Sequence, residues 1–355
     1  PAITDLDVWR DVSTAMMNTT DVTWQLKAET SITTSIAVPV KQWDIELTTA
    51  LTIPGVPFDK EIKVLGFNGF FDPSSGSSLM SVLDLDVMGG QGGSLDMVTD
   101  CEVINPSNIG ISLGPIVLEL WTAGSDEVQL GELILDDFAL NANEGGTAVT
   151  KLAQIRIFFT PPSGSDSALQ VGRDVLSRFV HGISQNITLR GARDGSGSNS
   201  SIWKPSMSIF STSTTLPGLV QNRMVLQSWM SLPSFWDPKS LPTSMLINNP
   251  FSAALTVKRA HCEVFLCKEK QTDTKCAEYD EESMGYYSPD AIDQFIPGKT
   301  EMELDKRKSH LYYIDPGQLG ALGGSLVRVA GPMYLAIGDV DLTIDYEERD
   351  VPISL

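Results

Sequence analysis

The sequence has few of the residues and motifs that enzymes use for catalysis. Its 355 residues include three histidines, His181, His261 and His310, and none lies in a recognisable catalytic motif. There is no Gly-x-Ser-x-Gly turn, no phosphate-binding loop and no His-Glu-x-x-His helix. His181 follows an apolar helix end, where a favourable interaction with the helix dipole explains it. We therefore predict that the chain is not an enzyme and binds no cofactor.

Basic residues and long apolar runs are also scarce. The chain has 25 Lys and Arg against 45 Asp and Glu, and its net charge of −20 repels nucleic acid and anionic membrane surfaces. The apolar stretch from Leu319 to Ile337 contains Arg328, Pro332 and several glycines, so we expect no membrane insertion within this chain. With 355 residues, of which 42% are hydrophobic and 20% charged, the chain is expected to be globular and is long enough for two domains.

The four cysteines fall into two pairs by their surroundings. Cys101 and Cys262 each lie on the apolar face of an alternating segment, so both are predicted to be buried thiols. Cys267 and Cys276 enclose a polar segment, which favours a disulfide across a hairpin loop in an oxidising compartment. Zinc binding is the alternative, but the sequence offers no histidines at zinc-ligand spacing.

Three Asn-x-Ser/Thr triplets are candidate glycosylation sites, at Asn18, Asn186 and Asn199. Asn18 and Asn186 both lie where a predicted helix ends and the strand after it begins. Together with the cysteine loop, these triplets favour a glycoprotein that is secreted or lies in the lumen of the secretory pathway, including the vacuole.

The sequence repeats itself. The segment 47–56, which ends in Pro54-Gly55-Val56, returns as 210–219, 163 positions later. The Asn-Pro pair at Asn105 returns at Asn249, 144 positions later, so the two copies differ by loop insertions. We predict two modules, residues 1–163 and 164–355, with a boundary near the proline pair that begins at Pro161.

A helix followed by a strand is predicted three times, over residues 6–26, 169–190 and 319–345, because 3.6-residue apolar patterns precede alternating ones. The predicted apolar stripes include Val8, Leu169, Leu326 and Val329. A chain that begins and ends on the same element is typical of a tandem array.

Between these elements the chain reads as short strands that are separated by turn residues. In Ser81–Val87, for example, Leu83, Leu85 and Val87 are predicted to point inward, with Asp84 and Asp86 in water. The predicted fold is all-β, with two tandem immunoglobulin- or fibronectin-like antiparallel β-sandwiches and short linking helices. The further strands expected are 95–104, 109–121, 128–140 and 147–159 in the first module and 222–230, 243–247, 254–266 and 300–304 in the second.

The Asn-Pro-Ser-Asn-Ile-Gly segment at 105–110 and the strand pair around it, followed by Gly131-Glu-Leu-Ile-Leu-Asp-Asp, resemble the type 2 late-embryogenesis-abundant (water-stress and hypersensitive-response) domain. The resemblance is greatest to tandem versions in large fungal and protist secretory-pathway proteins of unknown function. It covers about residues 22–310. It implies a small β-sandwich with one helix at its end, and no catalytic residues.

Two groups of residues are weaker candidates for binding. Asp339 and Asp341 share one face of a predicted strand and could begin a calcium site, or they form the solvated face of that strand. Trp229, Phe235 and Trp236 mark an apolar, proline-rich region. It is either core at the joint between modules or a contact patch for another subunit.

The leading hypothesis is a structural protein whose modules assemble head to tail into a filament or surface array through self-association. The terminal residues Val351, Ile353 and Leu355 would dock on a neighbouring module, so deletion of residues 346–355 would leave both sandwiches folded. The alternative is a lipid-binding or lipid-transfer module of a membrane-anchored lumenal protein, since an apolar groove can open between two sheets.

Overall fold

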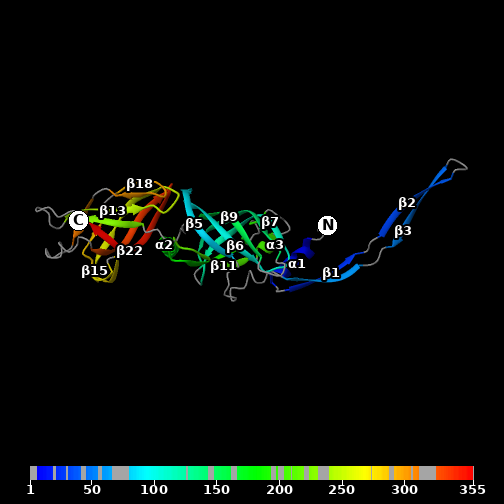
Figure 1. Cartoon of the computed structure of the whole chain (residues 1–355), viewed down its shortest axis with the longest axis horizontal. Coiled ribbons are helices and arrows are strands. Elements are labelled where there is room, and N and C mark those ends of the chain that lie inside the picture. Colours follow the sequence, from blue (N-terminus) through cyan, green and yellow to red (C-terminus); the bar gives the residue numbers. More distant parts are fainter. Residues whose placement is uncertain are drawn as a thin grey trace.

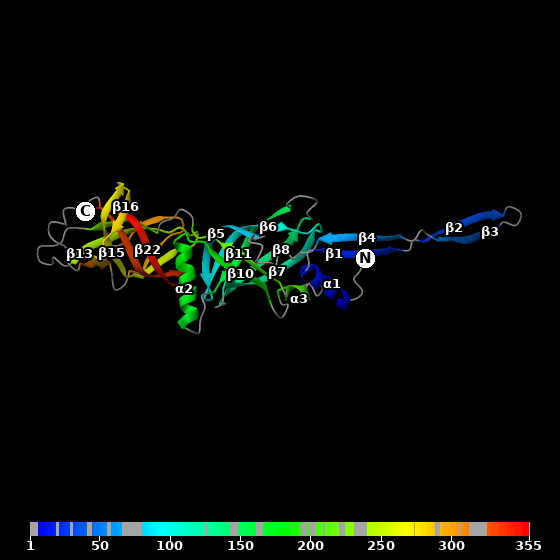
Figure 2. The same cartoon turned by 90° about the horizontal axis from the view of Figure 1, so that it is seen from below.

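The computed structural model describes most of the chain, and the account below concerns these residues. They are 6–18, 21–28, 31–40, 45–54, 58–65, 80–124, 127–142, 148–160, 166–192, 197–198, 204–208, 210–219, 224–230, 240–272, 274–287, 292–304, 307–311 and 325–354. The molecule is elongated, with two β units in a row and a narrow β-ribbon that extends from the far side of the first unit (Figures 1 and 2).

The N-terminal part consists of one helix and a ribbon. Helix α1 (Leu6–Asn18) precedes β1 (Asp21–Ala28), which pairs antiparallel with β4 (Phe58–Leu65). Between them, β2 (Ser31–Val40) pairs with β3 (Ile45–Pro54). We call the ribbon formed by β1–β4 the arm (Figure 2).

The first unit is a seven-stranded antiparallel sheet in the order β11-β10-β7-β8-β9-β6-β5. Its two outermost strands, β11 and β5, lie close to each other. The Thr214 hydroxyl on β11 donates a hydrogen bond of 2.6 Å to the Met80 carbonyl on β5. The elements are β5 (Met80–Gln91), β6 (Ser94–Asn105), β7 (Ile111–Thr122), β8 (Gln129–Leu140), β9 (Ala148–Phe159), α2 (Asp166–Val180), β10 (Gln185–Gly191), α3 (Lys204–Met207) and β11 (Ser211–Leu216).

The second unit closes into a ring of paired strands. From β15 the pairing runs through β17, β20, β13, β12, β22 and β21 and returns to β15, and the β12–β22 pair is parallel. Its strands are β12 (Val225–Met230), β13 (Ser240–Asn248), β14 (Leu255–Ala260), β15 (Cys262–Thr272), β16 (Lys275–Tyr279), β17 (Gly285–Tyr287), β18 (Gln294–Ile296), β19 (Glu301–Glu303), β20 (Arg307–Leu311), β21 (Leu326–Ile337) and β22 (Val340–Ser354).

When the β15–β21 pairing is included, corresponding strands follow one another in the same order in the two units. Strands β12 and β13 correspond to β5 and β6, and β14 with β15 corresponds to β7. The last two strands, β21 and β22, correspond to β10 and β11. The predicted all-β class is confirmed, with sheets that form sandwich-like layers and short helices beside them.

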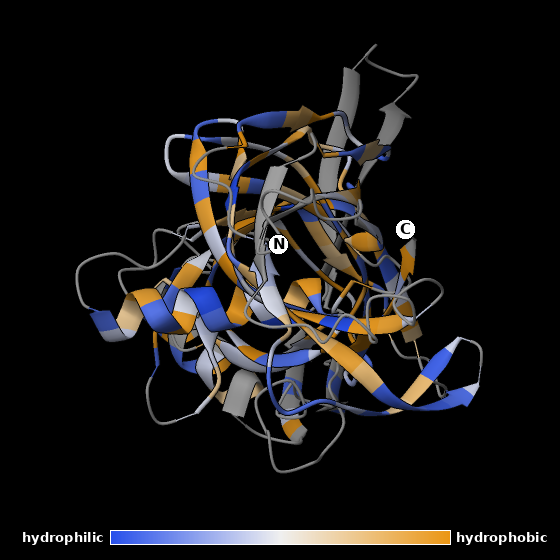
Figure 3. Cartoon of the chain, turned by 90° about the vertical axis from the view of Figure 1, so that its left-hand side faces the viewer, coloured by the Kyte–Doolittle hydropathy of each residue, from blue (hydrophilic) through white to orange (hydrophobic). Residues whose placement is uncertain are grey.

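Each unit has an apolar core made by alternation along its strands. In β6 every second side chain is buried, including Leu95, Met97, Cys101 and Val103, as the sequence predicts. Blue and orange alternate along many strands in Figure 3, which shows this periodicity of two. Full burial of one aliphatic side chain contributes roughly 1.5–3 kcal/mol.

The predicted module boundary at residue 163 is wrong. Strands β10 and β11 lie after it in the sequence and yet belong to the first sheet, where β10 pairs with β7. The first unit therefore runs to Leu216, and the second begins at β12. The proline pair at Pro161 lies outside the described residues.

The predicted C-terminal helix and docking strand also need correction. Leu326 and Val329 lie in strand β21, where a helix was expected. Val351 and Ile353 are buried in the second unit because β22 pairs with both β21 and β12. They are therefore core residues of this chain and do not form a free docking edge. Leu319, Leu322 and Leu355 lie outside the described residues.

Some side chains expected inside are exposed. Leu83 is 49% exposed because the pairing of β5 with β6 shifts between Val82 and Asp84, and this irregularity reverses the faces on either side of it. Val8 and Leu169, near the starts of α1 and α2, are also exposed.

Candidate functional site: the joint between the two units

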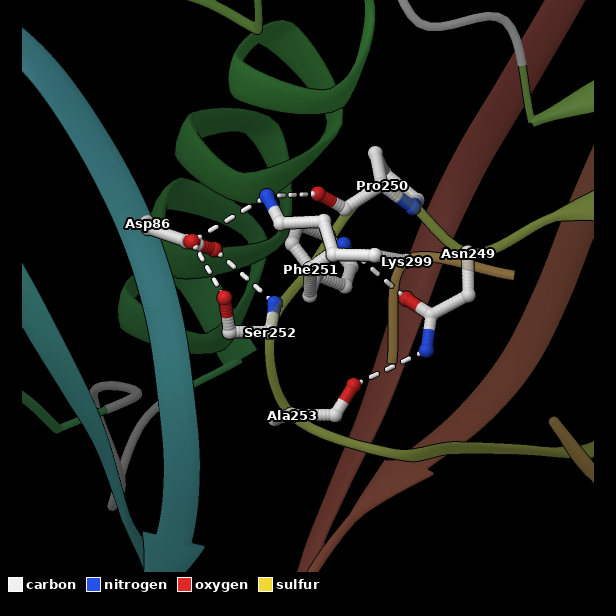
Figure 4. Close-up of polar contacts among 7 residues, drawn as sticks. All are labelled: Asp86, Asn249, Pro250, Phe251, Ser252, Ala253 and Lys299. Atoms are coloured by element: carbon white, nitrogen blue, oxygen red, sulfur yellow. Dashed lines mark hydrogen bonds and ion pairs between the residues drawn. The ribbon is translucent and has the colours of Figure 1, made fainter. Parts of the chain in front are cut away.

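The candidate site is the joint, where the first unit, helix α2 and the second unit meet (Figures 2 and 4). Three sets of contacts form it. They are an Asn-Pro loop against β5, one turn against another turn, and helix α2 against β22.

The Asn-Pro loop after β13 is held in shape by one buried amide. The Asn249 side chain donates hydrogen bonds to the carbonyls of Ala253 at 2.8 Å and Pro297 at 3.0 Å, and its Oδ1 accepts the Phe251 N–H at 3.0 Å. Pro250 supports this turn because its ring Cδ would clash with a helical Asn249, which keeps the preceding Asn extended. The loop therefore presents residues 251–253 in one conformation (Figure 4).

This loop docks on strand β5 of the first unit. The Ala253 N–H donates to the Val87 carbonyl at 2.8 Å. The Ser252 N–H and hydroxyl donate to the two carboxylate oxygens of Asp86 at 3.0 and 2.6 Å. Asp86 thus receives two hydrogen bonds from a residue 166 positions away, which ties the two units together.

Lys299 completes the contact around Asp86. Its ammonium donates to the Pro250 carbonyl at 2.6 Å and lies 3.1 Å from the carboxylate of Asp86 (Figure 4). Burial opposes ionisation of Asp86, but the hydrogen bonds from Ser252 and Lys299 and the lysine charge outweigh it, so the pKa of Asp86 is lowered. The site therefore favours a carboxylate at neutral pH.

The second set of contacts brings two glycine turns together. A Cβ atom added to Gly90 would lie 2.1 Å from the Ile337 carbonyl oxygen. One added to Gly338, whose φ is +61°, would lie 2.0 Å from the Gly90 carbonyl oxygen. The Asp339 carboxylate accepts the Gly92 N–H at 3.0 Å beside them. The glycine-rich turn at 89–93 thus allows the backbones of the two units to touch.

Helix α2 provides the third set of contacts. Arg173 forms an ion pair with Asp345, and the Ser177 hydroxyl accepts the Asp345 N–H at 2.9 Å. The Nε2 atom of His181 accepts the Glu347 N–H at 2.6 Å, and its ring stacks on Tyr346. His181 therefore connects the end of α2 to the last strand of the second unit.

Apolar packing fills the space between α2 and the Asn-Pro loop. The rings of Phe179 and Phe251 stack with their centres 6.5 Å apart, and both side chains are buried. Stacked aromatic pairs contribute about 0.5–1.5 kcal/mol beyond their buried area. Together with the backbone bonds, this packing predicts a joint with little freedom to bend.

A similar arrangement lies at the other end of the first unit. Helix α1 contacts α3, which directly precedes β11, the counterpart of β22. Met16 lies 163 positions before Phe179 and is likewise buried. The Asn108 side chain, in the Asn-Pro loop of the first unit, donates to the Lys63 carbonyl of the arm at 3.2 Å. The loop and helix that form the joint are thus both repeated.

The weak calcium candidates are each engaged elsewhere. Asp339 accepts the Gly92 N–H, and Asp341 forms an ion pair with Lys258. Among the described residues, no group of three or more His, Cys, Asp or Glu side chains could hold a metal ion. The structure does not bring Asp339 and Asp341 together with further ligands.

The predicted disulfide is present in the structure. Cys267 and Cys276 are bonded across the β15–β16 hairpin, with Cα atoms 5.7 Å apart. Cys101 and Cys262 are free and buried, and burial raises the pKa of each thiol to about 12. These two thiols are therefore poor nucleophiles at neutral pH.

The remaining candidates lie apart from the joint contacts described above. Asn186 is exposed on β10, where its side chain accepts the Thr215 hydroxyl at 3.1 Å. Trp229 is half-buried on β12. The side chain of Asn18, and residues Asn199, Phe235 and Trp236, lie outside what the structure describes. No described helix is both long and apolar enough to span a membrane.

Sequence reasoning missed the residues of the joint. Asp86 was expected to lie in water, because alternation places it opposite Leu85 and Val87, and nothing local indicates Ser252 or Lys299 as its partners. The signal that was present is the recurrence of the Asn-Pro pair, which marks the loop that docks. The glycine run at 89–93 gave a second signal for a close backbone approach.

Comparison with known proteins gives one family. Residues 2–120 match the model of a family described as a protein of unknown function (DUF3712). The match extends from α1 through the arm to β7. No curated protein matches the chain. The resemblance to the late-embryogenesis-abundant domain stays a prediction.

Proposed function

We propose that this chain is a non-enzymatic structural protein in which β units are connected in series by one repeated, rigid joint. The observation that carries the proposal is the joint itself, with backbone bonds, an ion pair and aromatic packing in a single contact. A binding or catalytic domain on a flexible linker needs none of these contacts. A spacer that must hold its units at a fixed angle needs all of them.

The chemistry of the described residues supports this choice. The half-buried carboxylate of Asp86 is used to connect two units, and the free thiols are deeply buried. The pocket of about 540 Å³ between α2 and β10 is lined by Asp174, Arg178 and Asn186 beside apolar residues, and a lipid chain favours a more apolar lining. These features favour a scaffold over a lipid carrier.

We further propose that the protein lies outside the cell or in the lumen of the secretory pathway. The disulfide between Cys267 and Cys276 is stable in an oxidising compartment, and Asn186, the acceptor residue of one glycosylation triplet, is exposed. The lowered pKa of Asp86 keeps the joint ionised in a mildly acidic lumen as well.

Electron microscopy of the purified chain tests the proposal. We expect particles with two units at one constant angle, and end-to-end rows where units of neighbouring molecules associate. The matched control is the chain with Gly90→Val, which keeps both units and places a side chain in the joint. Particles whose two units adopt many angles in the unmodified protein would show that the chain is not a rigid spacer.

A further inference from the structure

The N-terminal segment of the chain is a copy of the segment that closes the first unit. Val8-x-Arg10-Asp11-Val12 in α1 returns as Val171-x-Arg173-Asp174-Val175 in α2, 163 positions later. The Pro-Gly pair at Pro54 returns at Pro217 with the same spacing. Residues 8–56 therefore align with residues 171–219 without a gap.

In the first unit, this segment supplies the closing pair of strands. Strand β10 pairs with β7 so that Leu189 lies opposite Leu120, and β11 pairs with β10 on its other side. Ile187 and Leu189 are buried in the core at 2% and 0% exposure, and Leu216 of β11 is buried too. The pair thus completes a sheet whose other five strands are β5–β9.

The copy carries the same pattern of apolar and polar positions. The constant spacing places Trp24 and Leu26 at the positions of Ile187 and Leu189. It likewise places Ile53 at the position of Leu216. On the opposite face of β1, Thr23 and Gln25 are exposed, and alternation puts the apolar residues together on the other face.

In this structure the arm pairs only with itself, among the residues described. Strand β1 pairs with β4, which puts Trp24 opposite Ile62. In the register of β10 and β11, where Ile187 lies opposite Thr214, Trp24 would lie opposite Leu51. A two-stranded ribbon is marginally stable in water, and its apolar face needs a further layer. The apolar side chains of the equivalent element, Ile187, Leu189 and Leu216, are buried where it closes the first unit.

We propose that the segment 8–56 is the closing element of a further unit of this fold, and that its partner is a five-stranded antiparallel sheet of the β5–β9 type. The partner is named by the template within this chain, since β10 of the equivalent pair is hydrogen-bonded to β7 at the edge of such a sheet. On docking, β1 pairs with the β7-like edge strand and adopts the register of β10. This inference rests on the proposed function. It deepens that function by naming the sheet to which the segment 8–56 binds.

Strand exchange within the full chain tests the proposal. In the first variant, residues 185–190 take the sequence of 22–27 and residues 211–216 take the sequence of 48–53. The matched control uses 21–26 and 47–52, a slip of one residue that turns the apolar side chains to the wrong face. The readout is hydrogen exchange of the β7 amides that point toward β10, since these lose their partners when β10 is unpaired, whereas the other β7 amides point toward β8.

We expect the in-register variant to keep β7 protection within about tenfold of the unmodified chain and the slipped control to lose it. Loss in both variants, or protection in both, would overturn the proposal. Because Trp at position 187 could overfill the core, a second variant exchanges only residues 211–216, which changes four side chains. In this second variant the β7 amides must also stay protected, and in its slipped control they must lose protection. The angle between the two units, measured by electron microscopy, tests the rigid joint separately. The proposed function and this inference can therefore fail independently of each other.

Discussion

The two Asn-Pro loops of this molecule have the same internal bonds and different neighbours. Asn105 and Asn249 are both fully buried, and each donates to carbonyls of its own unit and accepts an N–H two residues later. The Asn249 loop then docks on Asp86 of the other unit, whereas the Asn105 loop contacts the arm, through Asn108. The loop is thus part of how each unit folds, and docking is a separate property that Phe251, Ser252 and Lys299 add.

The largest effect is expected from a change in the last strand of the second unit. Val351 has 0% exposure on β22, which connects β21 to β12, so Val351→Asp buries an unpaired charge and should cost at least about 4 kcal/mol. Pro352→Ser at the neighbouring exposed position is the control. Denaturant unfolding measures both. If the stability of the second unit were unchanged in Val351→Asp, the prediction that this terminus is a docking strand would be favoured again.

Removal of the two loop amides sharpens the comparison between the loops. Asn105→Ala and Asn249→Ala each leave several buried polar groups unpaired, so each should destabilise its unit by about 3 kcal/mol. Only Asn249→Ala should also loosen the joint. Unfolding measurements and the distance between labels on the two units check this, and equal loosening by both variants would contradict the separation of folding from docking.

A change at the glycine turn should break docking without unfolding a unit. In Gly90→Val the new Cβ meets the Ile337 carbonyl oxygen at 2.1 Å, so the turns must separate. Gly89→Val is the matched control, because a Cβ at Gly89 meets nothing within 4 Å. We expect a broadened distribution of angles between the units for Gly90→Val alone, measured by small-angle scattering.

The smallest effect is expected at Asp86, and it depends on pH. Because the pKa of Asp86 is lowered below its ordinary value of 3.8, its contribution is present above that value and is lost as the pH falls through the folded-state pKa. Asp86→Asn should therefore loosen the joint by about 1 kcal/mol at pH 7 and by less at pH 3. Asp84→Asn, which affects a bond within the first unit, serves as control. A pH-independent effect would show that the charge is unimportant.

Much of the fold could be predicted from the sequence, because it depends on local periodicity. Alternation predicted β6 to β9, and the 3.6-residue pattern predicted α1 and α2. The module boundary could not be predicted, because β10 and β11 join the first sheet through long-range pairing with β7. The irregularity at Val82 and Asp84, which exposes Leu83, likewise depends on the partner strand β6.

Of the candidate site, only sequence motifs such as the repeated Asn-Pro pair could be recognised from the sequence. The recurrent Asn-Pro pair and the glycine run indicated where special backbone would lie. The partners of Asp86 are 166 and 213 positions away, at Ser252 and Lys299, and no local pattern connects them. The C-terminal strand shows the same limit, since its terminal residues were expected to dock on a neighbouring module and the structure pairs them within this chain.

The most direct test of the account is the distance between the two units in solution. Spin labels at Val149→Cys in the first unit and Phe295→Cys in the second lie at exposed positions, while Cys101 and Cys262 are buried and the other two cysteines are bonded. Pulsed electron resonance should give one narrow distance distribution, which Gly90→Val broadens and Gly89→Val leaves unchanged. A broad distribution in the labelled chain without these joint changes, or one that Gly90→Val does not alter, would contradict a rigid joint.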